Sequence, residues 1–462
     1  MDVVRFRHLL AGTVLVCLCR NLTFAQQETT LTLEQSLQIA KQTNLSFQTA
    51  QEQVKSAEAQ AKLARAALLP KVNVSSSYTY IKDLPKSVID ASSGFGPPAA
   101  GGETPPADSG ASDSGDVIEL EFGAHHNFDA QVALSQPIFA WGRYYYGYKS
   151  ATLNVEAARK ELIAAENQLV LDVTEAFYRV LLAQEFIAVS ERTVKLVEEQ
   201  LRIAQAQFNA GASTNFDVLR AEVLLANARS QLIRARNQSR IAMDAYKNVL
   251  NLEMADNVNV QGSLERPVVP LELDALIRGA MENRPELQQF AFSQQAAEKQ
   301  VAVAKTGNRP DLSFFSTYRV EDNERLEEMN RIWNVGFQLN FPIFDGLATR
   351  AAVGQAESGL RQVELGEQQL TDSIEFEVRS AYLNLLEAKA LIEVQRQTVE
   401  QGLESVRIAT MRFENGIITG VELTDAQIAL AQAEVNRLQA YHDYAVGLAR
   451  LEKAIGQPLA EQ

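Results

Sequence analysis

The sequence contains an internal repeat: long segments of its first half recur in its second half at constant spacing. Residues 33–78 align with residues 273–318 at an offset of 240. Further along, Pro137-Ile138-Phe139 aligns with Pro342-Ile343-Phe344 at an offset of 205. A repeat of about 200 residues is far longer than any solenoid unit. The pattern therefore predicts a duplicated structural unit with pseudo-twofold character.

The difference between the two offsets locates an insertion of 35 residues in the first copy, between Tyr78 and Pro137. Its centre, residues 91–116, is rich in Gly, Pro, Ser and Asp, a composition typical of a flexible surface loop. We expect a first repeat over 26–262, with a long loop at 81–126 between its two strands, and a second repeat over 263–462. Each repeat should contain a helix, a strand pair and a long helical hairpin.

The first 25 residues have the pattern of a secretory signal peptide. Arg5 and Arg7 precede an apolar run over 9–19, and Thr23-Phe24-Ala25 offers small residues for cleavage. Both cysteines of the chain, Cys17 and Cys19, lie in this segment. The exported chain would therefore contain no disulfide and no thiolate metal site.

Two proline-free segments, 147–209 and 345–414, favour very long helices. In both, apolar residues recur every seven positions, as in coiled coils. The matching residues are Val173, Val180, Ile187, Val194, Leu201 and Phe208 in the first copy, and Val378, Leu385, Ile392, Val399, Val406 and Phe413 in the second. Return helices are predicted at about 215–251 and 420–455, so that each copy forms a long antiparallel hairpin.

Four segments of about ten residues alternate between apolar and polar side chains, with aromatic residues near their ends. They cover residues 72–80, 127–135, 312–319 and 333–341. A transmembrane β-strand needs about 9–11 residues, so these segments fit an outer-membrane sheet. The same alternation would suit a water-soluble sandwich, and the signal peptide and the giant helices weigh against that alternative.

Four strands cannot close a barrel, and open sheet edges are not tolerated in lipid. Two chains would supply eight strands, whose interior is filled by side chains, whereas three chains would supply twelve and leave a lumen. The predicted fold class is therefore α+β: a trimeric twelve-stranded transmembrane β-barrel, with four strands per chain, continuing into a long α-helical coiled-coil barrel. Twelve helical segments would form that second barrel.

Composition and motifs exclude several classes of function. A formal charge of −15 disfavours nucleic-acid binding, which needs clustered Lys and Arg. The sequence carries no phosphate-binding loop, zinc-protease helix or nucleophile elbow, so we expect neither an enzyme nor a cofactor. His125 and His126 lie beside a predicted strand, where surface-loop histidines are the favoured interpretation and metal binding stays open.

With these features assembled, the chain resembles the TolC-type outer-membrane efflux proteins. The resemblance rests on the PIF strand ends and on the helical turns RIAQAQFNAGASTNFDVLRAE and RIATMRFENGIITGVELTDAQ, and it covers essentially the whole mature chain. The first turn departs from the R-[FY]-x-x-G motif, with Gln207 where the second has Arg412. The resemblance implies a homotrimeric channel in outer-membrane lipid that extends into the periplasm. Its implied partners are a periplasmic adaptor and an inner-membrane pump or ATP-driven exporter.

The resemblance also places the turns at the periplasmic tip, where adaptor hairpins dock. The implied adaptor contacts are Phe208, Gly211, Ala212, Ser213, Phe413, Gly416, Ile417 and Ile418. Each glycine, taken alone, is equally well explained as a structural helix end. An exposed Ile417-Ile418 pair favours contact, since apolar tips without a partner are a liability.

Three acids follow the tips, and two explanations compete for them. Thr419-Gly-Val-Glu422 and, more weakly, Thr214-Asn-Phe-Asp217 have capping-box spacing, so Asp217 and Glu422 could simply cap helices. Asp425 lies past the first turn, and capping does not explain it. The resemblance places Glu422 and Asp425 at the periplasmic mouth, where carboxylates from three chains would favour cations.

A second class of function remains open from the residues alone. A secreted structural coiled-coil protein with a small β-domain would share the helices and the strands. The favoured hypothesis is the outer-membrane component of a tripartite efflux or type I secretion system. It would be a passive conduit for drugs, other small molecules or exported polypeptides.

Overall fold

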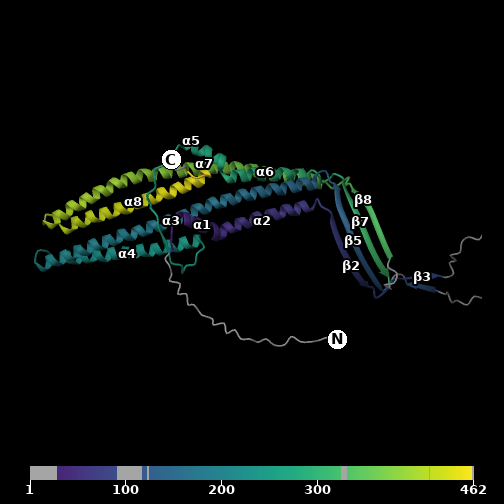
Figure 1. Cartoon of the computed structure of the whole chain (residues 1–462), viewed down its shortest axis with the longest axis horizontal. Coiled ribbons are helices and arrows are strands. Elements are labelled where there is room, and N and C mark those ends of the chain that lie inside the picture. Colours follow the sequence, from purple (N-terminus) through teal and green to yellow (C-terminus); the bar gives the residue numbers. More distant parts are fainter. Residues whose placement is uncertain (1–28, 91–116, 122–123, 324–329, 416, 460–462) are drawn as a thin grey trace, which may run out of the picture. The chain divides into compact units, whose positions relative to one another are not determined.

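The computed structural model describes residues 29–90, 117–121, 124–323, 330–415 and 417–459 (Figure 1). The predicted signal peptide and the loop centre 91–116 lie outside these residues. The helices are α1 (Leu33–Thr43), α2 (Leu45–Ala66), α3 (Arg143–Asn209), α4 (Asn215–Val249), α5 (Leu273–Asn283), α6 (Pro285–Ala304), α7 (Ala348–Glu414) and α8 (Gly420–Ile455). The strands are β1 (Thr29–Leu31), β2 (Lys71–Tyr80), β3 (Lys86–Asp90), β4 (Val117–Glu121), β5 (His126–Phe139), β6 (Val258–Val260), β7 (Asp311–Asn323) and β8 (Asn330–Asn340).

The order of the helices runs twice along the chain at the two spacings of the sequence repeat. Helices α1 and α5 have 11 residues each and begin 240 residues apart. Helices α3 and α7 have 67 residues each and begin 205 residues apart. The two compact units of the structure nevertheless each draw on both halves of the chain.

The first unit is built from the described residues within 1–49, 165–284 and 374–462, and it is almost entirely helical. In its first hairpin, Val194 and Val197 of α3 pack against Leu225 and Ala228 of α4. The heptad residues of α3 differ along its length: Val173 and Val180 are fully buried, whereas Phe208 is 43% exposed. A heptad pattern identifies the apolar face of a helix. It does not show which part of that face is covered by other helices of the same chain.

Two equivalent joints hold the short helices of this unit against the ends of the return helices. At the first joint, the buried Tyr246 hydroxyl of α4 donates to Ser36 Oγ of α1 at 2.5 Å, and Asn44 Nδ2 donates to the Val249 carbonyl at 2.9 Å. At the second joint, Arg284 after α5 donates to the Lys453 carbonyl of α8 at 2.8 Å. A short parallel strand pair also belongs to this unit, with β1 against β6 and Thr29 opposite Val258.

The second unit, residues 50–164 and 285–373, contains a four-stranded antiparallel sheet in the order β2-β5-β7-β8 (Figure 1). The four predicted strand segments lie in these four strands, apart from the last residue of the fourth, Phe341, which follows β8. The register pairs Lys71 with Ser135 and Asp311 with Asn340. A bulge at Pro137 to Phe139 interrupts the β5–β7 pairing. The four predicted strand segments therefore pair with one another in a single sheet.

The stretch 81–126, expected to be one long loop, contains a further strand pair, β3 against β4, with Lys86 opposite Glu121. The expectation of loop throughout was therefore wrong for these ten residues. The Gly- and Pro-rich composition of their neighbours hid two five-residue strands, which are too short to show alternation clearly.

Large apolar side chains are exposed along the four-stranded sheet in this single chain. They include Val72, Val74, Tyr78, Trp333, Val335, Phe337 and Leu339. An exposed apolar surface of this extent marks an interaction surface. Within the described residues, no helix combines the length and the hydropathy that a membrane crossing requires.

Candidate functional site

The first hairpin tip is a tight turn between α3 and α4. Gly211 has a φ of +71°, a conformation that glycine adopts without strain, and its amide donates to the Phe208 carbonyl at 2.9 Å. The Ala212 amide reaches back to the Gln207 carbonyl at 2.9 Å. These bonds close the carbonyl end of α3, and Gly211 has open space around it. The turn is therefore both a helix end and an accessible surface.

The second tip joins α7 to α8 and has the same closing bond, from the Ile417 amide to the Arg412 carbonyl at 2.8 Å. Ile417 is 65% exposed, whereas Ile418 and Phe413 are half-buried. Gly416 lies outside the described residues. The predicted Ile417-Ile418 pair is thus split, with Ile417 in solvent and Ile418 against the hairpins.

The Asp217 carboxylate caps helix α4, as the Thr-x-x-Asp spacing predicts. Its Oδ2 accepts from the Thr214 amide at 3.0 Å, from the Thr214 hydroxyl at 2.7 Å and from the Ser213 hydroxyl at 2.9 Å. These hydrogen bonds, the one from the Thr214 hydroxyl first, lower the pKa of Asp217 below its usual value. The capping hydrogen bonds therefore favour the ionised form of Asp217.

At the second tip the Glu422 carboxylate accepts from the Thr419 amide at 2.9 Å and from its hydroxyl at 3.3 Å. Asp425 is exposed, and no hydrogen bond or ion pair within the described residues reaches its carboxylate. Capping therefore accounts for the position of Glu422, whereas the described residues give Asp425 no hydrogen bond or ion pair.

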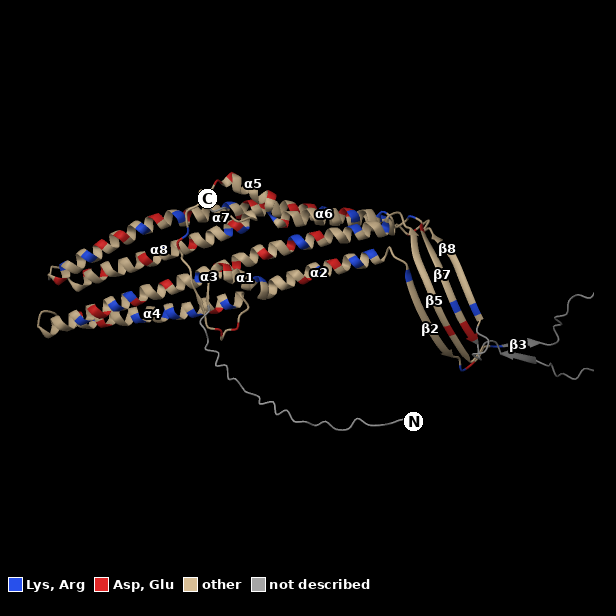
Figure 2. Ribbon diagram, in the orientation of Figure 1, with Lys and Arg blue, Asp and Glu red and all other residues tan. Residues whose placement is uncertain are grey.

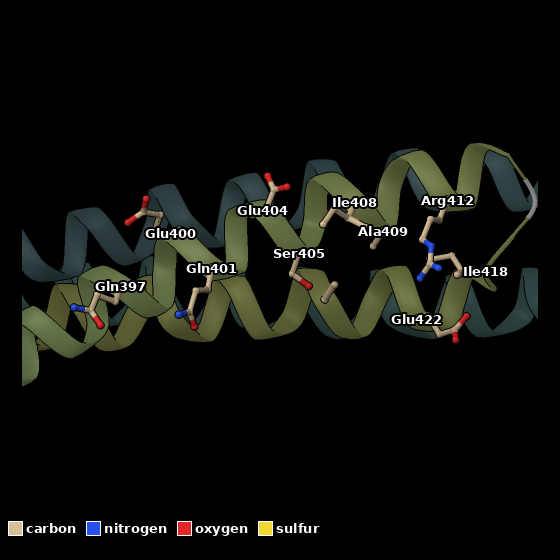
Figure 3. Close-up of a pocket in the computed structure, with 11 residues that line it drawn as sticks. Gln397, Glu400, Gln401, Glu404, Ser405, Ile408, Ala409, Arg412, Ile418 and Glu422 are labelled. Atoms are coloured by element: carbon tan, nitrogen blue, oxygen red, sulfur yellow. The ribbon is translucent and has the colours of Figure 1, made fainter.

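An open groove of about 780 Å³ runs along α7 and α8 behind the second tip (Figure 3). Glu400, Glu404 and Glu422 line it together with Arg412 and Ile418. Arg407 binds Glu404 through two hydrogen bonds of 2.6 and 2.7 Å, and the hydrogen bond lowers the pKa of Glu404. Sequence reasoning missed Glu400 and Glu404, although their four-residue spacing on α7 could have placed both on one helix face.

A second groove of about 460 Å³ lies between the two tips. It brings together four of the predicted tip residues and one of the acids: Ala212, Ser213, Phe413, Ile418 and Asp217, with Thr419 beside them. Phe208, Gly211 and Ile417 do not line it. The tip residues are therefore divided between a shared groove and separate exposed points.

One buried contact near the tips was not anticipated. Gln200 of α3 donates through Nε2 to the Gly420 carbonyl at 3.0 Å and to the Thr424 hydroxyl of α8. Its Oε1 is buried without a hydrogen-bond partner among the described residues. A lone Gln in a polar helix gives no sequence signal, because its partner lies more than two hundred residues away in the chain.

His125 and His126 lie at the end of the sheet where β2 finishes. The His126 ring is 2.7 Å from the Tyr78 hydroxyl through Nδ1, and His125 Nδ1 is 2.9 Å from the Ile81 carbonyl. No group of three or more potential metal ligands occurs within the described residues. The two histidines therefore have structural partners at the sheet end.

Comparison with known proteins agrees with this architecture. The family described as outer membrane efflux protein matches residues 36–251 and 276–457. The alkaline protease secretion protein AprF of Pseudomonas aeruginosa is 26% identical over 346 residues, which cover 72% of this chain and 70% of that protein. The outer membrane protein TolC of Escherichia coli is 21% identical over 343 residues, covering 71% and 69%.

Among solved structures, the CmeC outer membrane channel of Campylobacter jejuni has the same fold. It superposes with a TM-score of 0.76 at 18% identity, covering 92% of this chain and 85% of that one. The family match spans most of the chain and includes both hairpins. The chain belongs to the TolC-type outer membrane efflux protein family and is a protein of the outer membrane.

Proposed function

We propose that this protein is the outer-membrane duct of a tripartite efflux or type I secretion system, formed by a homotrimer. As a member of its family it is an outer-membrane channel for efflux or secretion. The relatives include proteins named for protease secretion and for pyoverdine export, so the cargo class stays open between small molecules and polypeptides. In this proposal the chain comprises a signal peptide, 1–25, and two structural repeats, 26–262 and 263–462.

The trimer is supported by the edges of the sheet. Strands β2 and β8 are its outer strands, and among the described residues each pairs with one neighbouring strand. Unpaired strand edges are not tolerated in the hydrocarbon of a membrane, so other chains must pair with them. Three copies would close twelve strands around a lumen, with the exposed apolar residues of the sheet facing lipid.

Adaptor docking at the tips is supported by apolar exposure at the ends of the hairpins. Phe208 and Phe216 at the first tip and Ile417 at the second are large apolar side chains that are 43%, 69% and 65% exposed at the ends of the hairpins. These exposed apolar tips are the observation that carries the proposal. A periplasmic adaptor with helical hairpins of its own would remove them from water.

Replacement of Ile417 by Glu tests the docking proposal. Ile417 is largely exposed, so the change should leave the trimer inserted but lower drug resistance or secretion at least tenfold, because docking would bury a charge. Crosslinking to the adaptor should fall in parallel. Val268→Glu, at an exposed apolar residue of the loop before α5, is the matched control and should keep full transport. Undiminished transport and crosslinking in Ile417→Glu would contradict the proposal.

The acids beyond the tips would make the periplasmic mouth favour cations. Asp217, Glu422 and Asp425 are exposed on each chain, and three chains would surround the opening with their carboxylates. The double variant Glu422→Gln with Asp425→Asn should reduce the cation-to-anion permeability ratio in planar bilayers by about threefold or more. Gln at position 422 can still accept from the Thr419 amide, so the helix cap is retained.

The control removes two exposed carboxylates from loops outside the tips, through Glu253→Gln with Glu272→Gln. This pair should leave the permeability ratio unchanged. If the tip variant also leaves the permeability ratio unchanged, Glu422 serves only as a helix cap. The ion selectivity of the mouth then does not depend on these acids.

A further inference from the structure

Of the cations at the junctions between helices and strands in the second unit, four exposed ones without an ion pair among the described residues lie near the starts of β2, α3, β7 and α7. Two others, Arg143 and Lys305, are bound by Thr306 and Glu357, respectively. The four are Lys71 at the start of β2, Lys149 near the start of α3, Arg309 just before β7 and Arg350 near the start of α7. All four are exposed, and none forms an ion pair with a carboxylate among the described residues. Unpaired cations gathered in one place are unexpected in a chain whose formal charge is −15.

The sheet register brings these junctions to one end of the sheet. Lys71 lies opposite Ser135 close to the end of β5, and Asp311, the first residue of β7, lies opposite Asn340, the last residue of β8. The junctions that lead into β2 and β7 and out of β5 and β8 therefore lie at the same end of the sheet. Figure 2 shows Lys and Arg where helices of this unit approach the sheet.

Aromatic and apolar side chains accompany the cations. The Arg309 guanidinium lies 5.3 Å from the centre of the Trp141 ring, and Lys149 Nζ lies 5.8 Å from that of Tyr145. Ile343, in the β8–α7 junction, is 89% exposed. Tryptophan and tyrosine beside Lys or Arg are typical of the level where a membrane's hydrocarbon meets its headgroups.

Two acids at this end of the sheet accept hydrogen bonds from neutral donors and form no ion pair with the four cations. Asp345 accepts from the Thr349 amide at 2.9 Å and so caps α7, and Asp311 accepts from Asn340 at 3.3 Å. At the opposite end of the sheet Arg319 pairs with Asp129 and lies 3.7 Å from Glu321, whereas Lys82 and Arg331 there are exposed without an ion pair among the described residues. The helix-side end therefore carries the larger group of cations without a carboxylate partner.

We propose that Lys71, Lys149, Arg309 and Arg350 form a basic collar that binds the phosphate groups of anionic phospholipids. The lipids would belong to the leaflet at the helix-side end of the sheet, the periplasmic leaflet. The inference rests on the proposed function, in which the sheet lies in the outer membrane. Continuity with the exposed apolar surface of the sheet selects lipid as the occupant, and charge complementarity selects anionic headgroups.

The test compares bound lipid for the full-length protein reconstituted in nanodiscs of phosphatidylethanolamine with a minor fraction of phosphatidylglycerol. Native mass spectrometry should find phosphatidylglycerol enriched about fivefold over its bulk fraction on the wild-type protein. The variant with Lys71, Lys149, Arg309 and Arg350 all changed to Gln should bring this enrichment to within about twofold of bulk. Unchanged enrichment would overturn the proposal.

A matched control removes four exposed cations of the helical unit: Lys195, Arg234, Arg240 and Lys389, each changed to Gln. It should keep the wild-type enrichment. If the collar variant keeps its lipids but changes ion selectivity, the collar faces the lumen; if it keeps its lipids but loses its trimers, the collar faces a neighbouring chain. Either result overturns the lipid assignment.

Conductance separates failure of this inference from failure of the proposed function. A wild-type protein that conducts ions in planar bilayers without enriching phosphatidylglycerol contradicts only the collar. A protein that neither inserts nor conducts in bilayers of any composition contradicts the channel on which the collar depends.

Discussion

The two joints between short helices and return helices lie at corresponding positions of the sequence repeat and differ in chemistry. At the first joint, Tyr246 donates to Ser36 Oγ, and the Ser36 hydroxyl donates in turn to the Thr32 carbonyl at 2.6 Å. The corresponding residues of the second joint, at offsets of 240 and 205, are Leu276 and Leu451, both buried. A buried hydrogen-bond chain in one copy is thus replaced by buried leucines in the other.

The helix ends differ in the same way. Asn44 uses its amide to bind the Val249 carbonyl at the end of α4. Its counterpart Arg284, only 4% exposed, binds the Lys453 carbonyl and pairs with Glu377 at 2.8 Å, and Glu377 also accepts from Lys453 Nζ at 2.8 Å. The comparison teaches that corresponding helix ends are joined in both halves of the chain while the side chains that join them vary.

The comparison predicts its largest effect at Arg284. Arg284→Met leaves Glu377 with Lys453 alone and removes the bond to the Lys453 carbonyl. The local opening free energy at the second joint should fall by about 3 kcal/mol, the lower end for breaking a buried pair. Hydrogen exchange of α5 and the end of α8 measures it. The exposed Arg278→Met is the control on α5, and equal exchange in the two variants would refute the ionic joint.

A smaller effect is expected at the first joint. Tyr246→Phe removes the donor to Ser36 while keeping the ring, and should lower the local opening free energy of α1 by about 1–2 kcal/mol. The Ser36 hydroxyl keeps its bond to Thr32, which limits the loss. Tyr382→Phe, at a half-buried ring, should leave exchange in α1 unchanged. If Tyr246→Phe lowered the local opening free energy as much as Arg284→Met, the two joints would not differ in the strength of their polar contacts.

The smallest effect concerns pH at the first tip. The lowered pKa of Asp217 means that its capping contribution is complete above the unfolded-state pKa of about 4 and is lost as pH falls through the lower folded value. Exchange protection of the Thr214 amide should therefore persist at pH 5 and weaken only in stronger acid. Asp217→Asn should abolish this pH dependence, and a Thr214 amide that loses protection near pH 5 would contradict the capping geometry.

Much of the architecture could be predicted because it depends on local pattern. Proline-free segments and heptads predict α3 and α7, and alternation predicts β2, β5, β7 and β8. The spacing of Thr214 and Asp217 predicts a cap that the structure contains. These features arise from residues that are neighbours in the chain, where sequence and geometry are directly linked.

The remainder could not be predicted because it depends on distant partners. Gln200 becomes a buried contact only because α8 lies beside α3. The pair β1 and β6 has three residues in each strand, which is too short for alternation to appear. Asp425 is exposed and has no hydrogen bond or ion pair among the described residues, so its contacts within this chain do not test its proposed role at the mouth. The docking and pore roles of the tips remain predictions for the same reason.

The short pairing of β1 with β6 has a consequence for the order in which the chain can fold. Thr29 meets Val258, and Thr43 binds the Leu250 carbonyl from 207 residues away. Helix α1 therefore emerges early from export but finds its place only after both arms of the first hairpin have crossed the inner membrane. Contacts of such long sequence separation form slowly. Until then, the apolar side of α1 must be shielded in the periplasm, and assembly should be limited by this late closure.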